Sequence, residues 1–583
     1  MDAIPATDNK PTKSQSSPSR RPAHGSTRDT LRIIPLGGNE EVGRNMTVFE
    51  YAGDIVILDM GIQFPEEDMP GIDYIIPNIS YLKGKEKNIR GVILSHGHLD
   101  HIGAAPILLK SLGYPPIIGR DLTIAMVKRR MEDFEKGSSQ NLKTRRVASA
   151  DDKIRLGKFE ISFFEVEHSI MDAVGVIIRT PDGTVIHPGD WTMEKDSASG
   201  KTISYHHLTG LPSPRILMLE SLGAIVTNPN RTTEAEMYRN LEKLISAASG
   251  KIIIGTFSSQ IKRIGHILEY SEKIGKKVAL MGYSMKMNVE IAKSLGYIKA
   301  HKETLIPVSE IGKFPENRIV VICTGAQGED NAALSRIITD NDRHVKIKKT
   351  DTIIFSSSVI PGNERTIQRL KDNLYRKCDN VIHGNLMDLH TSGHCSAPDI
   401  EEMLRQVRPD IFVPVYANHY MLKEAAKLAE HIGFRKENIF VLDNGNVLEI
   451  QRGVARVLAK KVDTSYVFVD GLGIGDIGQV VLRDRQVLSE DGMFVITILL
   501  DSKTKKVVGN IQVTSRGFIY VKDNFDLVNE AKRKIQKAIK ETTSKNTSVE
   551  KKFIEDKIRE VVGLYLFQKT ERRPMVLPVV IEV

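Results

Sequence analysis

Cysteine is scarce in this chain, and its scarcity excludes two kinds of small domain. Among 583 residues there are three cysteines, Cys323, Cys378 and Cys395, which are widely spaced and form no C-x-x-C pair. Such spacing argues against a disulfide framework and against a cysteine-rich zinc module. Any metal that the chain binds must therefore be held by histidine and carboxylate side chains.

Long apolar runs are also missing. The longest nearly uninterrupted one spans residues 493–500, whereas a membrane-spanning helix needs ~20 residues. The N-terminus is polar and has no apolar segment after its basic residues, so a secretory signal is not expected. The sequence therefore predicts a cytoplasmic protein with no transmembrane helix.

The bulk composition is that of an ordinary globular protein, with 41% hydrophobic and 27% charged residues. The chain is too long for one core, so we expect about three domains. The formal net charge of +9 and the pI near 9.1 are compatible with a polyanionic partner. A solvated surface explains these charges equally well.

A cluster of potential metal ligands follows a short apolar run. Residues 96–101 read H-G-H-L-D-H, which places four such side chains in six residues. In an extended segment, side chains two residues apart point to the same side, so His96 and His98 could share one metal. Asp100 and His101 would then turn toward a second metal. Because zinc prefers imidazole and carboxylate ligands, the string predicts a dinuclear metal site.

Two further candidate ligands stand at the ends of later strand-like runs. His168 closes the run 159–167, and Asp190 closes the run 184–189. Both residues fall in loops, where functional side chains are common. We therefore expect His168 and Asp190 to join the ligands of residues 96–101.

The pattern along the first part of the chain predicts a tail and a layered unit. Residues 1–28 are rich in Pro, Ser, Thr, Lys and Arg and lack large apolar residues beyond Ile4, so we expect a disordered basic tail. Strand-like runs then come in pairs joined by turn residues, 46–51 with 55–58 and 174–180 with 184–187. These pairs predict hairpins in a layered α/β unit over residues 29–225.

Helix and strand patterns alternate regularly from about Thr232, which predicts a doubly wound parallel sheet over residues 226–383. Loops that contain histidine follow, as they do in the first unit. We therefore expect residues 384–452 to return to that unit, with the parallel-sheet domain inserted into it.

The last part of the chain is predicted to hold a linker, residues 453–478, and an α+β domain, residues 479–583. The glycine-rich stretch 471–478 contains a formal G-x-G-x-x-G. We expect a strand at residues 480–482, and a strand there is the wrong context for a dinucleotide-binding fingerprint. Strands are also expected at residues 494–500 and 518–521, before two helices.

Several motifs together resemble a known family. They are S-H-G-H-L-D-H-I-G-A at 95–104, E-H-S at 167–169, H-P-G-D at 187–190, T-G-A-Q-G-E at 324–329, I-P-G-N-E at 360–364, H-T-S-G-H at 390–394 and R-R-P-M-V-L-P-V-V-I-E-V at 572–583. The chain resembles the metallo-β-lactamase superfamily, its β-CASP nucleases and, within these, the ribonuclease J family over roughly residues 29–583. The resemblance implies an αββα sandwich with an inserted β-CASP domain and a small C-terminal domain.

The resemblance also implies roles for individual residues. His96, His98 and His168 would hold one zinc ion, Asp100 and His101 would hold a second, and Asp190 would bridge the two. Manganese or magnesium could replace zinc. The implied catalytic residues are Asp100, Glu220 and His394. From the chemistry of the residues themselves, we expect hydroxyls, imidazoles and backbone N–H groups of one loop to bind RNA phosphates, namely those of His390, Thr391, Ser392, Gly393 and His394.

The chain departs from the family at one ligand position. The family has a histidine in a P-V-H-G-E string, whereas residues 414–418 here read P-V-Y-A-N. Tyr416 stands in place of that histidine, and His419 lies three residues later. Either Tyr416 replaces the ligand, His419 reaches in from a shifted loop, or one metal is held loosely. We favour a weakened site that His419 could complete.

The implied activity is metal-dependent hydrolysis of RNA phosphodiesters during RNA maturation and decay. The resemblance implies a 5′ to 3′ exonuclease that prefers 5′-monophosphate ends and also cuts internally. The implied partners are single-stranded RNA, further copies of the chain in a homodimer or homotetramer, and an RNA-degradation complex. Two alternatives remain: a weakly active or inactive paralogue that serves as an RNA-binding scaffold, and a metallo-hydrolase of another substrate.

Overall fold

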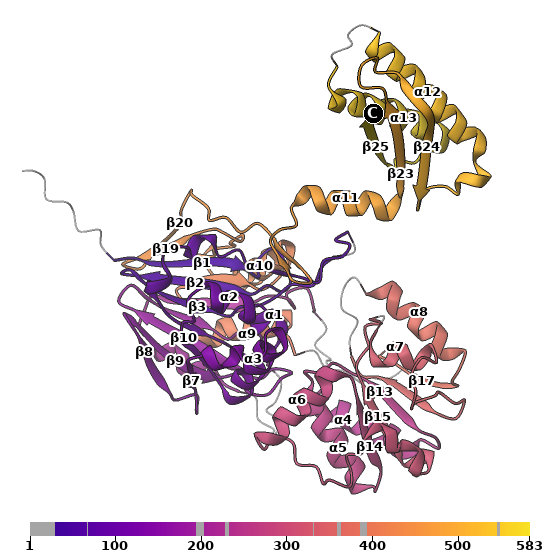
Figure 1. Ribbon diagram of the computed structural model, residues 1–583. Coiled ribbons are helices and arrows are strands. Elements are labelled where there is room, and N and C mark those ends of the chain that lie inside the picture. Colours follow the sequence, from indigo (N-terminus) through magenta and orange to yellow (C-terminus); the bar gives the residue numbers. More distant parts are fainter. Residues whose placement is uncertain are drawn as a thin grey trace, which may run out of the picture.

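The computed structural model describes residues 29–66, 68–193, 203–227, 232–329, 331–357, 363–384, 393–544 and 549–583. The predicted tail, residues 1–28, lies outside the described residues, as do His390, Thr391 and Ser392. Figure 1 shows a two-sheet body, a parallel-sheet body and a smaller C-terminal body that follows helix α11 (Gln479–Glu490). No helix within the described ranges has the length and apolar character needed to cross a membrane.

The first body is a sandwich of two mixed sheets. The first sheet has the strand order β20 (Val454–Val457), β19 (Leu448–Gln451), β1 (Leu31–Gly37), β2 (Met46–Tyr51), β3 (Asp54–Leu58), β5 (Ile89–Ile93), β6 (Ile117–Gly119) and β7 (Thr144–Arg146). The second has the order β18 (Ile411–Val415), β12 (Arg215–Glu220), β11 (Gly183–His187), β10 (Val174–Thr180), β9 (Phe159–Glu165) and β8 (Lys153–Leu156). Apolar side chains of both sheets, including Phe49 and Val176, share one core.

Helices cover the outer face of each sheet, which completes an αββα arrangement. Helices α2 (Ala105–Ser111) and α3 (Asp121–Phe134) pack on the first sheet, where Leu108 and Val127 join its core residues. Helices α9 (Ala397–Val407) and α10 (His419–His431) pack on the second sheet. Both sheets are therefore buried on both faces, which explains why several of their strands are apolar along their whole length.

The hairpins predicted from turn residues are confirmed. Strands β2 and β3 pair in antiparallel fashion around Ala52 and Gly53, whose φ angles are +51° and +83°. Two successive positive φ angles match the right-handed twist of the flanking strands. Strands β10 and β11 form the second predicted hairpin.

The inserted body is a five-stranded parallel sheet. Its strand order is β14 (Lys277–Met281), β15 (Ile319–Cys323), β13 (Ile252–Gly255), β16 (Thr352–Phe355) and β17 (Asn380–Ile382). One face is covered by α4 (Glu234–Ala247), α5 (Ile261–Lys273) and α6 (Tyr283–Ser294). The other face is covered by α7 (Ala333–Ile338) and α8 (Glu364–Tyr375). The predicted doubly wound sheet is confirmed.

The chain returns to the first body after the insertion. Strand β18 pairs in parallel with β12, and β19 pairs with β1 at the opposite end of the chain. The predicted α/β fold class, a sandwich with an inserted parallel-sheet domain, is therefore confirmed. Because of this return, loops that precede and follow the insertion can lie at one site.

The predicted linker is wrong in part. Residues 453–478 contain β20, which extends the first sheet, and β21 (Val467–Asp470) with β22 (Gly473–Ile474), which pair beside β4 (Tyr74–Ile76). Residues 480–482 begin helix α11 and not a strand. The paired valines favour a strand by propensity, but Val480 and Val481 are exposed here and Leu482 alone packs inward.

The C-terminal body has three strands and two helices. Its sheet has the order β24 (Val507–Arg516), β23 (Met493–Leu500) and β25 (Met575–Glu582), and it packs against α12 (Phe525–Thr543) and α13 (Lys551–Thr570). The predicted α+β composition holds, but the strand expected at residues 518–521 is wrong. Strand β24 ends before Gly517, whose φ is +72°, and most of its residues are exposed or half-buried. Because β24 has few buried apolar residues, its pattern in the sequence did not predict a strand.

Candidate metal centre

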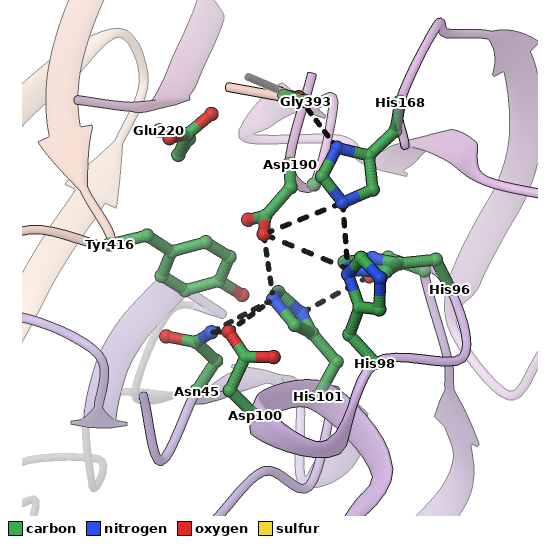
Figure 2. A network of polar contacts seen from close by, with 12 residues as sticks. Asn45, His96, His98, Asp100, His101, His168, Asp190, Glu220, Gly393 and Tyr416 are labelled. Carbon is green, nitrogen blue, oxygen red and sulfur yellow. Dashed lines mark hydrogen bonds and ion pairs between the residues drawn. The ribbon is translucent and has the colours of Figure 1, made fainter. Parts of the chain in front are cut away.

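The two sheets of the first body bring polar side chains to one place, shown in Figure 2. The contributing elements lie at the ends of buried strands, which hold side chains in fixed positions. His96 and His98 follow β5, Asp100 and His101 lie on the short helix α1 (Leu99–Ile102), His168 follows β9, Asp190 follows β11, and Glu220 ends β12.

Four side chains form the first group of potential ligands: His96, His98, His168 and Asp190. The Nδ1 atom of His98 lies 3.1 Å from Nε2 of His96 and 3.0 Å from Nε2 of His168. The Oδ2 atom of Asp190 lies 3.8 and 3.9 Å from those two Nε2 atoms. Ligand atoms about 2.0–2.2 Å from one zinc ion are roughly 3 to 3.5 Å apart. The imidazoles are therefore spaced as ligands of one ion, with the carboxylate slightly farther out.

Burial keeps the imidazoles of this first group neutral. Burial is the largest cause that lowers the pKa of His96 and His168 well below 6.5, and neighbouring imidazoles add to it. Burial also lowers the pKa of His98 to about 4. Because a metal binds the neutral imidazole, this donor set fits a divalent cation at neutral pH.

A second group shares Asp190 with the first and adds Asp100 and His101. The Nε2 atom of His101 lies 3.4 Å from Oδ2 of Asp100 and 3.3 Å from Oδ2 of Asp190. Burial alone would lower the pKa of His101, but the carboxylates of Asp190, Asp100 and Asp59 raise it well above 6.5. Negative charge gathered around one buried imidazole stabilises a cation at that position.

A third group consists of Asp190, Glu220 and His394. The Nδ1 atom of His394 lies 3.1 Å from Oε1 of Glu220 and 3.8 Å from Oδ2 of Asp190. Burial alone would lower the pKa of His394, yet the charges of Glu220 and Asp190 raise it to about 9. Burial raises the pKa of Glu220. A charged imidazole thus stands beside the ligand groups at neutral pH.

Neighbouring groups orient one histidine of each ligand group. Oδ2 of Asp59 lies 2.8 Å from Nδ1 of His101, which leaves Nε2 facing the second group. The carbonyl of Gly393 accepts a hydrogen bond from Nδ1 of His168 at 2.6 Å, which leaves its Nε2 facing the first group. Such partners fix the tautomer and the ring orientation of a ligating histidine. Gly393 thus lies at the site, although its contact is with a ligand.

Tyr416 is buried at the second group. Its ring centroid lies 5.4 Å from that of His101 and 4.9 Å from that of His187. Its hydroxyl donates a hydrogen bond to Oδ2 of Asp59 at 3.4 Å. Tyr416 therefore contacts the orienting carboxylate and occupies the position where a late ligand was expected.

His419 does not reach the metal centre, which corrects the expectation that it completes the second group. Its Nδ1 atom lies 3.2 Å from Oδ1 of Asp443, and these two residues cluster with Glu40 at a separate, more exposed place. The reason is local. Asn418 occupies the N-cap position of helix α10, and His419, the first residue of that helix, is exposed.

The sequence analysis missed two residues of this site. Asp59 directly follows the buried strand β3, and Asn45 precedes β2. A carboxylate at the end of a buried strand was a usable signal for Asp59. Asn45 had none, because a single asparagine beside a strand is common in turns.

Three known proteins that are similar to this chain carry the name ribonuclease J. The protein "Ribonuclease J 1" of Streptococcus pyogenes is 35% identical over 94% of this chain and 97% of its own length. "Ribonuclease J2" of Bacillus subtilis is 32% identical over 95% of this chain and 99% of its own length. "Ribonuclease J 2" of Staphylococcus aureus is 32% identical over 95% of this chain and 98% of its own length. The chain belongs to the ribonuclease J family.

Three family models match successive parts of the chain. The metallo-β-lactamase superfamily model matches residues 40–232, the ribonuclease J β-CASP model matches 249–374, and the ribonuclease J C-terminal model matches 480–583. The family resemblance predicted from the motifs is confirmed.

Proposed function

We propose that this chain hydrolyses RNA phosphodiester bonds with two divalent metal ions. One observation carries the proposal: two groups of largely buried potential ligands share the carboxylate of Asp190. A shared carboxylate is typical of dinuclear centres that hydrolyse phosphate esters. Membership in the ribonuclease J family supports RNA as the substrate.

The residues present fit two ions. His96, His98 and His168 would hold one, Asp100 and His101 would hold the other, and Asp190 would bridge them. We expect zinc, because the donors are imidazole nitrogens and carboxylate oxygens; manganese or magnesium remain alternatives. When bound, such a pair lowers the pKa of a water molecule and neutralises charge on the phosphoryl oxygens.

His394 is suited to act on the leaving group. Its imidazole is charged at neutral pH because Glu220 and Asp190 stand beside it. A charged imidazole can bind the scissile phosphate or give its proton to the leaving oxygen. Glu220 would hold His394 in place through the 3.1 Å contact to Nδ1. Asp100, which is half-buried at the second group, would orient the attacking water.

The finer activity is also a proposal. We propose a 5′ to 3′ exonuclease that prefers 5′-monophosphate ends and also cuts internally. Residues 390–394 would bind the substrate, and the place of Gly393 and His394 beside the ligands supports this role. A homodimer or homotetramer, an RNA-degradation complex and a cytoplasmic location stay predictions from the family resemblance.

Tyr416 supports one competing function. Because this residue departs from the family at a ligand position, the chain could hold the second metal poorly. It would then bind RNA as a weakly active or inactive scaffold. A metallo-hydrolase of another substrate is the other alternative.

Product analysis tests these functions directly. The substrates are internally labelled single-stranded RNAs with 5′-monophosphate, 5′-triphosphate or 5′-hydroxyl ends, each incubated with zinc or manganese. We expect mononucleotides to appear fastest from the monophosphate RNA. Asp100→Ala should lose this activity, whereas Asp133→Ala, at an exposed carboxylate on α3, should keep it. Tight RNA binding without metal-dependent cleavage would favour the scaffold.

A further inference from the structure

The second metal group has fewer ligands than the first. Asp100, His101 and Asp190 provide three donors, and a catalytic ion usually has three protein ligands besides its water. Asp190 is shared with the other ion, however, so the second ion has only two donors of its own. The residue that fills the late ligand position does not supply another donor at the required place.

Tyr416 faces the wrong edge of the His101 ring. Its hydroxyl contacts Oδ2 of Asp59 at 3.4 Å, and the same oxygen lies 2.8 Å from Nδ1 of His101. The ligand groups lie at the opposite edge, where Nε2 of His101 faces Asp100 and Asp190. The tyrosine hydroxyl thus supports the orienting carboxylate.

Asn45 lies at the ligand edge. The Nδ2 atom of its carboxamide is 2.9 Å from Nε2 of His101 and 3.3 Å from Oδ2 of Asp100, as Figure 2 shows. The distance between Nε2 of His101 and Oδ2 of Asp190 is also 3.3 Å. Atoms that bind one ion at about 2.0–2.2 Å are separated by roughly these distances. One end of the carboxamide therefore stands where a further ligand atom would stand.

The other end of the carboxamide is unsatisfied. Oδ1 of Asn45 is buried and has no hydrogen-bond partner among the residues that the structure describes. Turning the carboxamide by 180° about its last bond exchanges oxygen and nitrogen with little other movement. The oxygen then faces the atoms of Asp100 and His101, and an amide oxygen is a good ligand for a divalent cation.

The backbone holds Asn45 firmly in this position. Its N–H donates to the carbonyl of Asp100 at 3.0 Å, and its carbonyl accepts from the N–H of Gly61 at 2.9 Å. Gly38 packs directly against Oδ1 of Asn45 and the ring of Tyr416, where a Cβ atom would collide with both. Because the side chain is already held in place, binding an ion costs it little conformational entropy.

We propose that the side-chain oxygen of Asn45 is a ligand of the second metal ion and takes the part of the late histidine that Tyr416 replaces. This inference rests on the proposed two-metal function. It assigns Tyr416 a positioning role through Asp59, and it makes the second site of this chain depend on a residue ahead of β2.

Three variants separate a ligand from a merely structural asparagine. Asn45→Leu removes both polar atoms. Asn45→Asp keeps an oxygen but has no N–H to donate. Tyr416→Phe keeps the ring and removes the hydroxyl. Gln406→Leu is the control, since Gln406 is a buried carboxamide of the same body that contacts Tyr205 and Glu402, away from the ligands.

The readout is manganese binding to the full-length protein, measured by calorimetry and by metal content after dialysis. We expect two ions in the unsubstituted protein. Asn45→Leu should keep the first ion and bind the second at least about 10-fold more weakly, since loss of a supporting partner alone costs 10- to 100-fold. Asn45→Asp and the control should keep both. Tyr416→Phe should also keep both, with a smaller loss of affinity for the second ion than Asn45→Leu, because the hydroxyl acts only through Asp59.

Any other result would contradict either the inference about Asn45 or the proposed two-metal function. Unchanged binding of both ions in Asn45→Leu would overturn the inference. Equal loss in Asn45→Asp and Asn45→Leu would show that the amide N–H matters, and loss in Tyr416→Phe alone would make the tyrosine the ligand. Binding of no ion by the unsubstituted protein would instead refute the proposed function. Circular dichroism of each variant confirms that it is folded.

Discussion

The two metal groups of this protein are built in different ways. The first group takes its ligands from residues 96–190, and its three imidazoles are neutral because they are buried together. The second group surrounds one imidazole, His101, with carboxylates that raise its pKa. A site of neutral donors needs only correct spacing. A site of crowded charge depends on the cation that compensates the charge.

The two groups also differ in where their ligand residues lie in the sequence relative to the inserted domain. All first-group ligands precede the insertion, whereas the resemblance to the family implies, for the second group, a residue that follows it. That residue is Tyr416 here, on the loop after β18. The substitution at this position leaves the first group intact. The second group is therefore the one that this departure affects.

The strongest test is to remove what the two groups share. Asp190→Asn keeps the shape of the side chain and removes its charge. We expect loss of both ions and a decrease in RNA cleavage of roughly 1000-fold, about 4 kcal/mol, because the metals supply several kcal/mol of transition-state stabilisation. Metal content and initial rates measure these effects. If Asp190→Asn retained two ions, the bridging role would be wrong.

A matched pair of variants should separate the groups. Asp59→Asn weakens the partner that orients His101, and Gly393→Ala displaces the carbonyl that orients His168, because a Cβ there would lie 2.6 Å from Cβ of Ser169. We expect the first variant to lower the affinity of the second ion alone by about 10- to 100-fold. The second variant should do the same to the first ion alone.

Manganese titrations of both variants check this separation. The unsubstituted protein provides the reference for each ion. If both variants weakened the same ion, or both ions together, the two orienting contacts would not belong to separate sites. Thermal unfolding of each variant shows whether a general loss of stability accounts for the change.

The sequence pointed to the side chains of both groups because much of their pattern is local. Four potential ligands lie within six residues, and His168 and Asp190 each follow a buried strand, which can be read without knowing the fold. Asp59 was missed although it also follows a buried strand, and Asn45 was missed because its role depends on contacts with Asp100 and His101, more than 50 residues later. His419 was misjudged because its orientation is set by the start of helix α10.

Fold prediction followed the same rule. Regular alternation revealed the parallel sheet, and turn residues revealed the hairpins. The stretch 453–478 was misread because β21 pairs with β4, almost 400 residues earlier in the chain. Strand β24 was missed because most of its residues are exposed or half-buried. Pairing across such distances leaves little trace in local periodicity.

Replacing Tyr416 by the histidine that the family resemblance implies should reduce the difference between the two groups in metal binding. Tyr416 has a φ angle of +57°, a conformation that histidine adopts more readily than most residues. Tyr416→His should therefore fit the backbone and bind the second ion about 10-fold more tightly, consistent with the addition of one ligand. Calorimetry with manganese measures the gain. Unchanged affinity would mean that the loop places residue 416 out of reach of the ion.

The smallest expected effect concerns pH. His394 has a pKa of about 9 because Glu220 and Asp190 outweigh its burial, so it is charged below that pH and loses its proton above it. If charged His394 serves cleavage, activity falls as pH rises through this value. Glu220→Gln removes one of the two charges, so the alkaline limb should move to lower pH with little change at pH 6. An unshifted limb in rate profiles of both proteins would remove His394 as the proton donor.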